Sequence, residues 1–221
     1  MKMSRLKIML LSTAIVFTAS VLSQEKGFHI GPRVGIGASD INITDVSGER
    51  LGLSTATGIT TMYKFTRFFG ISADFLMDYR SMYRNGTGFI ANWNDFGPAD
   101  YVDRTNMLYA SIPLTANVSL GNEKFRVGFM AGPSINLFMY GDRNRVYNDR
   151  DLREYNNRTR LDGIHTFNPG FLYGFGFYSQ TKDNNTFYVD FRHSFGVESI
   201  GRINNNRVYT QQAVMSIGLL F

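Results

Sequence analysis

Hydrophobic and polar residues alternate along most of the chain, with apolar side chains at every second position. In the run "FRVGFMAGPSINLFM", large apolar side chains such as Phe125 and Phe129 share one face, and Arg126, Ser134 and Asn136 share the other. A period of two is typical of a β-strand whose two faces meet different surroundings. We therefore predict a strand wherever this alternation continues.

Eight such runs occur, and most of them are long. They lie near residues 28–39, 51–65, 68–82, 105–120, 125–139, 166–179, 186–198 and 207–221. An ordinary strand has about five or six residues, whereas a tilted strand that crosses a bilayer needs about 9–11. The run lengths favour membrane-spanning strands.

The connections between the runs also alternate in length. Tight turns lie around "KFTRF", "GNEK" and "TKDNN", and the other four connections are longer and polar. Short turns on one side and longer loops on the other are expected of an up-and-down barrel in an outer membrane. We therefore predict an all-β fold, an eight-stranded antiparallel up-and-down transmembrane β-barrel.

The two faces of the predicted strands indicate which solvent surrounds the barrel. The apolar faces carry no charges, while the opposite faces carry Gly, Ser, Thr and Asn with charges of both signs. An eight-stranded barrel is only wide enough inside for its own side chains, so it cannot enclose so many large apolar faces. We expect the apolar faces to meet lipid. A soluble lipocalin-like carrier, with an apolar pocket and a polar surface, is the alternative.

The inward faces then collect charges that nearly neutralise one another. We expect these side chains to form a polar network that plugs the lumen. A narrow porin-like channel for protons or ions through the same lumen is the alternative. The nine predicted lumen residues are Arg33, Lys64, Asp74, Asp78, Arg80, Arg126, Asp190, Arg192 and Glu198. His193 is an exception, because it falls on an apolar face.

The first residues have the pattern of a targeting segment. Lys2, Arg5 and Lys7 precede an apolar stretch from Ile8 to about Ala19. This stretch is short for a transmembrane helix, which needs about 20 residues. We predict a cleaved signal peptide at residues 1–23, followed by an outer-membrane β-barrel domain at residues 24–221. An uncleaved anchor helix is the alternative.

Removal of the signal peptide changes what the charge implies. Residues 1–23 hold three basic and no acidic side chains, so 20 basic and 18 acidic residues remain. The basic character is therefore mostly a property of the leader, and we expect no nucleic-acid partner. The chain has no cysteine, which excludes disulfides, thiolate metal ligands and cysteine nucleophiles.

The last predicted strand ends on an aromatic residue, Phe221, which closes an apolar face that includes Met215, Ile217 and Leu219. A terminal strand of this kind resembles the C-terminal signal of outer-membrane barrels. In those proteins the barrel-assembly machinery recognises the signal. We therefore expect Phe221 to act as an assembly signal and that machinery to be a partner during biogenesis.

Three segments resemble the PorT-like outer-membrane β-barrel family of Gram-negative bacteria. They are "GPRVGIGAS", "YASIPLTANVSLGNEKFRVGFMAGPSINLFM" and "FRHSFG", and the pairing of "IPL" at 112–114 with "AGPS" at 131–134 is the most specific element. The resemblance extends over nearly the whole mature chain and implies an eight-stranded barrel in the outer membrane. It does not imply one activity, since fold does not settle function. One branch of the family is tied to a protein secretion system, and these motifs do not select that branch.

Motifs of common enzymes are missing from the chain. It has no GxSxG elbow, no HExxH and no P-loop, and the three histidines lie in separate contexts. We expect no catalytic site, metal or cofactor. A membrane enzyme is the alternative, for which Asp190, Ser194 and Glu198 are the nearest grouping.

Two long polar connections are the candidate functional surfaces. The segment 140–165 carries six arginines and five acidic residues, and the segment 84–104 holds the only tryptophan, Trp93, near Phe89, Phe96 and Tyr101. They are either solvated loops that cover the barrel mouth or binding surfaces, because loops on a rigid scaffold often carry function. We expect a monomeric barrel in outer-membrane lipid with a structural or interaction role through these loops, and an extracellular or secretion partner.

Overall fold

The computed structural model describes residues 27–43, 49–66, 68–91, 96–122, 124–147, 157–161, 163–181, 185–203 and 206–221. The predicted signal peptide at residues 1–23 lies outside this part. Within it, no helix is long and apolar enough to cross a membrane. The strands of the described residues are β1 (Phe28–Ile43), β2 (Glu49–Lys64), β3 (Phe69–Ala91), β4 (Phe96–Gly121), β5 (Phe125–Tyr147), β6 (Asn157–Arg160), β7 (Phe167–Gln180), β8 (Thr186–Gly196), β9 (Gly201–Ile203) and β10 (Asn206–Leu220).

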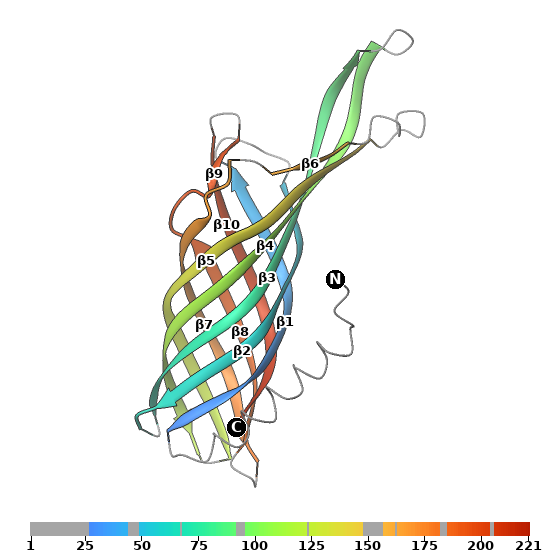
Figure 1. Cartoon of the computed structure of the whole chain (residues 1–221). Coiled ribbons are helices and arrows are strands. Elements are labelled where there is room, and N and C mark those ends of the chain that lie inside the picture. Colours follow the sequence, from blue (N-terminus) through green and yellow to red (C-terminus); the bar gives the residue numbers. More distant parts are fainter. Residues whose placement is uncertain are drawn as a thin grey trace, which may run out of the picture.

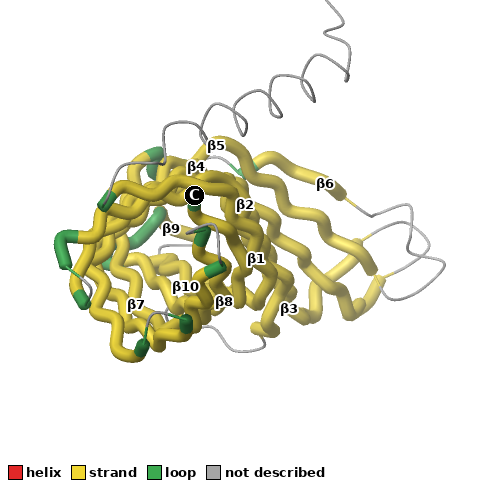
Figure 2. Tube along the Cα trace, turned by 90° about the horizontal axis from the view of Figure 1, so that it is seen from below, coloured by secondary structure: helices red, strands yellow, loops and turns green. Residues whose placement is uncertain are grey.

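Eight of these strands form a closed antiparallel ring. Their order is β1-β2-β3-β4-β5-β7-β8-β10, and β10 pairs with β1 to complete the wall (Figures 1 and 2). Each ring strand corresponds to one of the eight predicted runs, so the prediction of an eight-stranded up-and-down barrel is confirmed. The short strands β6 and β9 pair with β5 and β10 outside this ring order.

Short polar sequences close the tight turns at one end of the barrel, which we call the short-turn end. After β2, Thr66 Oγ1 accepts hydrogen bonds from the backbone N–H groups two and three residues later, at 3.2 and 3.0 Å. After β4, Asn122 Oδ1 makes the same two contacts at 3.0 and 2.8 Å, and Gly121 takes a φ of +136°. Such side-chain-to-backbone bonds favour turns locally, which explains why these turns are readable from the sequence.

Three strands exceed their predicted runs by much more than the others do. β3, β4 and β5 have 23, 26 and 23 residues and continue past the ring at the end opposite the short turns (Figure 1). We call the projecting sheet the arm; it comprises residues 84–91, 96–104 and 141–147 together with β6. The prediction of loops at 84–104 and 140–165 is therefore wrong for the residues that form these strands. Trp93 and residues 148–156 lie outside the described residues.

The outer surface of the ring is apolar. Phe191 is 40% exposed between buried Asp190 and Arg192, and Phe129 is 57% exposed beside buried Met130. This order confirms that the apolar face points outward and the charged face inward. It contradicts the lipocalin-like alternative, in which the two faces are exchanged.

His193, the polar exception on this outer face, lies within a row of aromatic rings. Its ring centroid is 5.2 Å from that of Tyr173 and 6.1 Å from that of Phe195. The imidazole therefore packs as one member of an aromatic row on the outside of the barrel.

Candidate functional site

Two arginines and two aspartates form an ion network across the lumen, which we call the four-residue network. Arg33 on β1 donates to Asp190 on β8, and Arg192 on β8 donates to Asp74 on β3. Arg33 Nη1 also lies 3.8 Å from Asp74 Oδ2, and Arg192 Nη2 lies 3.3 Å from Asp190 Oδ2. All four side chains are buried. Each charge therefore has two opposite neighbours, and the network carries no net charge.

A second network is centred on Asp78 and Arg80, which follow Asp74 on the inward face of β3. Arg80 Nη2 lies 2.6 Å from Asp78 Oδ2, and Arg80 Nη1 donates to Thr210 Oγ1 at 2.9 Å. The same Asp78 oxygen accepts hydrogen bonds from Ser111 at 3.2 Å and from Gln212 at 2.9 Å. This Asp78–Arg80 network joins β3 to β4 and β10, so it also crosses the interior.

Apolar layers separate and cap the two networks. The inward residues of β3 run in the order Asp74, Leu76, Asp78, Arg80 and Met82, so charged and apolar layers alternate along the barrel. The three buried apolar clusters are Met62, Met130, Leu172, Tyr178, Tyr188 and Leu220; Ala56, Leu76 and Val214; and Met82, Met107, Tyr109, Ile200 and Val208. Each ionic network is therefore shielded from bulk water by apolar and neutral polar side chains, and the pairing of its charges matters most there.

Two cavities in the lumen are small. One of about 30 Å³ lies beside the four-residue network and is lined by Arg33, Arg192 and Gln212 among others. A second of about 20 Å³ lies at the short-turn end, between Lys64 and Arg126. A water molecule needs roughly 10–15 Å³ on this measure. The first cavity therefore takes about two or three waters, and side chains fill the space around it.

The structure brings six of the nine predicted lumen charges into the two networks: Arg33, Asp74, Asp78, Arg80, Asp190 and Arg192. Lys64 and Arg126 face the lumen only at its short-turn end and are half-buried. The predicted lumen position of Glu198 is wrong, because β8 ends at Gly196 and the Glu198 side chain is exposed. Alternation cannot be extended past the last paired residue of a strand.

Several neutral partners of the networks were not among the predicted site residues. Ser111 Oγ donates to Asn136 Oδ1 at 2.8 Å, and Asn136 Nδ2 donates to the backbone oxygen of Asn168 at 3.1 Å. Thr210 and Gln212 bond to the charged pair. These residues occupy inward-facing positions of the predicted strands. That position could have identified them as partners, since a buried charge needs hydrogen-bonding groups around it.

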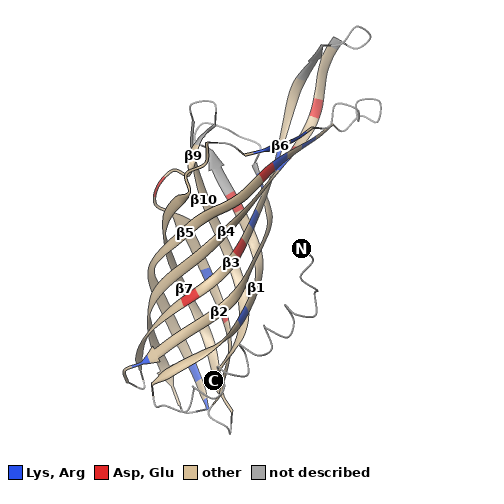
Figure 3. Ribbon diagram, viewed as in Figure 1, with Lys and Arg blue, Asp and Glu red and all other residues tan. Residues whose placement is uncertain are grey.

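The arm carries charged residues of both signs (Figure 3), and several of them form ion pairs. Asp103 accepts hydrogen bonds from Arg143 and from Arg145, whose Nε lies 2.8 Å from Asp103 Oδ1. Arg158 Nε on β6 lies 2.5 Å from Asp142 Oδ2 on β5. Burial acts to raise the pKa of Asp103, but the hydrogen bond from Arg145 and the charges of both arginines outweigh burial and lower the pKa below its ordinary value.

The predicted assembly signal lies at the seam that closes the ring. The backbone N–H of Phe221 donates to Ile30 O at 3.0 Å, and the N–H of Ile30 donates to Phe221 O at 3.3 Å. Phe221 therefore continues the β1–β10 pairing past Leu220, the last residue of β10. Elsewhere in the described part of the chain, no three potential metal ligands of the His, Asp and Glu types gather into a site.

A family model described as an outer membrane protein beta-barrel domain matches residues 19–201. This description is broader than the predicted PorT-like family, which stays a prediction. No curated protein resembles the chain closely enough to count as a match.

The chain also resembles solved outer-membrane proteins at low identity. The attachment invasion locus protein Ail of Yersinia pestis is 13% identical, with 89% of this chain and 100% of that chain covered and a TM-score of 0.42. Neisserial surface protein A is 11% identical, with 89% and 98% covered and a TM-score of 0.42. OprG of Pseudomonas aeruginosa is 13% identical, with 88% and 94% covered and a TM-score of 0.44.

Proposed function

The chain belongs to the outer membrane protein beta-barrel domain family, and on this premise we propose that it is a membrane-embedded interaction protein with a plugged lumen. Its location is the outer membrane of a Gram-negative bacterium, where its apolar wall meets lipid. In this proposal the barrel is a rigid support, the arm is the extracellular binding surface, and no chemistry is catalysed.

The observation that carries the proposal is the length of β3, β4 and β5. A tilted strand needs about 9–11 residues to cross a bilayer, whereas these strands have 23, 26 and 23. The additional residues remain paired, for example Gly88 with Ala99 and Tyr101 with Tyr147. The arm therefore continues the barrel wall, which supports a role in presenting a surface at a fixed position outside the membrane.

The interior supports a plug rather than a channel. The four-residue network and the Asp78–Arg80 network each join different sides of the ring, and both are covered by apolar layers. An ion entering this path would have to break paired, buried charges, which is costly. The narrow porin-like channel is the competing function.

Planar-bilayer recording of the purified barrel tests the plug. We expect no conductance steps at either polarity. Steady unitary steps that survive removal of contaminating porins would support the channel and contradict the plug.

Photo-crosslinking in intact cells tests the arm. A crosslinking amino acid at Thr87, which is exposed on the arm, is expected to capture an extracellular or secretion partner in a discrete adduct. The matched control is Val34, which is exposed on the lipid-facing wall. No adduct from Thr87, or the same protein adduct from both positions, would contradict the interaction role.

A further inference from the structure

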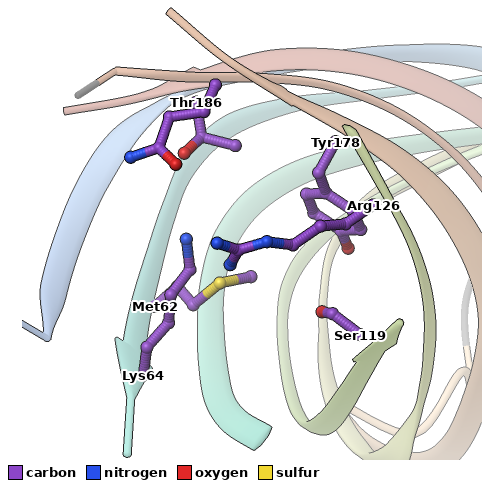
Figure 4. Close-up of a pocket in the computed structure, with 7 residues that line it drawn as sticks. Met62, Lys64, Ser119, Arg126, Tyr178 and Thr186 are labelled. Atoms are coloured by element: carbon purple, nitrogen blue, oxygen red, sulfur yellow. The ribbon is translucent and has the colours of Figure 1, made fainter. Parts of the chain in front are cut away.

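The mouth of the barrel at the short-turn end holds two cations that face one another. Lys64 is the last residue of β2, and Arg126 is the second residue of β5. Figure 4 shows their charged groups pointing toward each other into the cavity of about 20 Å³. The hydroxyl-bearing residues Ser119, Tyr178 and Thr186 line the same cavity. This arrangement is separate from the arm and from both ionic networks.

Neither cation has an acidic partner among the described residues. Lys64 makes no ion pair or side-chain hydrogen bond there, and Arg126 uses its Nε only to donate to the backbone oxygen of Asn122 at 3.2 Å. The charges of both cations act on His29 of β1, and the buried Nδ1 atom of His29 has no hydrogen-bond partner among the described residues. By contrast, both arginines of the four-residue network are paired with aspartates.

Like charges held together in a half-buried site repel each other, and a bound anion removes that repulsion. Arginine and lysine are also the side chains that most often bind phosphate, because their N–H groups make charge-assisted hydrogen bonds to its oxygens. Hydroxyl groups around the cations can donate further bonds to the same oxygens. We propose that Lys64 and Arg126 form a binding site for one phosphate group at the periplasmic mouth of the barrel.

The position of the site fits two sources of that phosphate. Exposed aromatic rings surround this end of the barrel, with the ring of Tyr63 packed against Phe65 at 4.9 Å and Phe65 stacked on Phe69 at 5.7 Å. Aromatic belts of this kind lie at the level of the lipid headgroups. The phosphate is therefore either that of an inner-leaflet phospholipid or free phosphate in the periplasm, and the chemistry of the site is the same for both.

Purified full-length barrel in a phosphate-free detergent provides the test. The first assay titrates inorganic phosphate into the protein, with sodium chloride of equal ionic strength as the reference, and measures binding by calorimetry. The second assay adds phosphatidylglycerol and counts the retained lipids by native mass spectrometry. The variant is Lys64→Gln with Arg126→Gln, and the matched control is Lys124→Gln, which removes an exposed cation from the same rim.

We expect the double variant to weaken binding by about tenfold or more, as loss of two charge-assisted contacts predicts, and the control to bind like the native protein. Binding of inorganic phosphate that depends on both cations identifies free phosphate as sufficient. Binding seen only with the lipid identifies the headgroup as the source. Equal binding by the native protein, the double variant and the control, or no binding in either assay, overturns the site. Heat-modifiable electrophoretic mobility verifies that each variant is folded, and the result does not depend on what the arm binds.

Discussion

Arg192 on β8 donates a hydrogen bond to Asp74 on β3, and these two strands stand on opposite sides of the eight-stranded ring. The barrel is therefore held together through its interior as well as around its wall. A contact of this kind restrains the shape of the ring, but its two charges depend on each other because neither is solvated.

Replacing Asp74 with asparagine is expected to destabilise the barrel strongly. Two buried arginines would then share one aspartate, and breaking a buried pair costs about 3–5 kcal/mol. Urea unfolding in lipid vesicles, followed by electrophoretic mobility, measures the loss. Adding Arg192→Gln removes the surplus charge and should recover part of the stability. Additive effects of the two changes would show that the residues do not interact.

Gly218 lies directly opposite Tyr188 in the β8–β10 pairing, and the aromatic ring covers the glycine. A Cβ atom at position 218 would overlap the tyrosine ring. Gly218→Ala is therefore expected to cost about 1–3 kcal/mol through overpacking. The control is Gly97→Ala on the arm, where no atom of the described residues lies within 4 Å of the added carbon. The same urea titration compares them, and equal stability of the two variants would contradict the close contact.

A charge on the lipid-facing wall should oppose insertion. Phe191 projects outward near the middle of β8, and a lysine near the bilayer midplane costs about 2–4 kcal/mol. Phe191→Lys is expected to fold poorly into vesicles, whereas Val146→Lys, at an exposed position on the arm, should fold normally. Refolding yield in vesicles is the measurement. Normal refolding of Phe191→Lys would place the apolar wall away from lipid.

The arm is expected to loosen at acidic pH because the pKa of Asp103 is lowered in the folded state. A lowered carboxylate pKa adds stability above the pKa of the unfolded carboxyl, about 4, and that stability is lost as the pH falls through the folded pKa. Amide hydrogen exchange should show reduced protection of the arm below about pH 4. Asp103→Asn should weaken protection at neutral pH and flatten the pH dependence, whereas Asp100→Asn, at an exposed position, should not.

Phe221→Ala is expected to reduce the amount of barrel assembled in cells. The proposed reason is recognition of the terminal aromatic residue by the assembly machinery, so unassisted refolding in detergent should change little. Membrane fractionation with heat-modifiable mobility measures the yield in cells. The control is Met215→Ala on the exposed face of the same strand. Equal losses in cells and in detergent would indicate a role in stability instead.

The strands of the ring were predictable because their two faces meet opposite environments. Lipid outside and charge inside force a period of two, and this pattern extends through all eight ring strands. The arm lacks that contrast. Asn85 and Thr87 are exposed on it and alternate with Gly86 and Gly88, so no apolar face marks this part of β3. Its structure comes from backbone pairing with β4, which single-sequence patterning does not show.

The lumen was predictable as a set of side chains but not as a set of contacts. Parity along a strand decides that Arg33 and Asp190 point inward, whereas the strand register decides that they meet. Lys64 and Arg126 also occupy inward-facing positions, but they lie at the ends of their strands. The strand register places no acidic side chain of the described residues opposite them. The predicted neutralisation of the lumen charges therefore holds for the two networks, whereas at the mouth the described residues include no acid paired with either cation.

The β1–β10 seam has a consequence for how the protein is made. Gln211 Nε2 donates to Asp40 Oδ2 at 3.3 Å across this seam, and the two residues are 171 positions apart in the chain. Contacts between such distant segments form slowly, since a long stretch of chain must be ordered before they are gained. Until the last strand arrives, the first strand presents an open edge to which other chains can add. We therefore expect the unassembled chain to be prone to aggregation until β10 pairs with β1 and closes the ring.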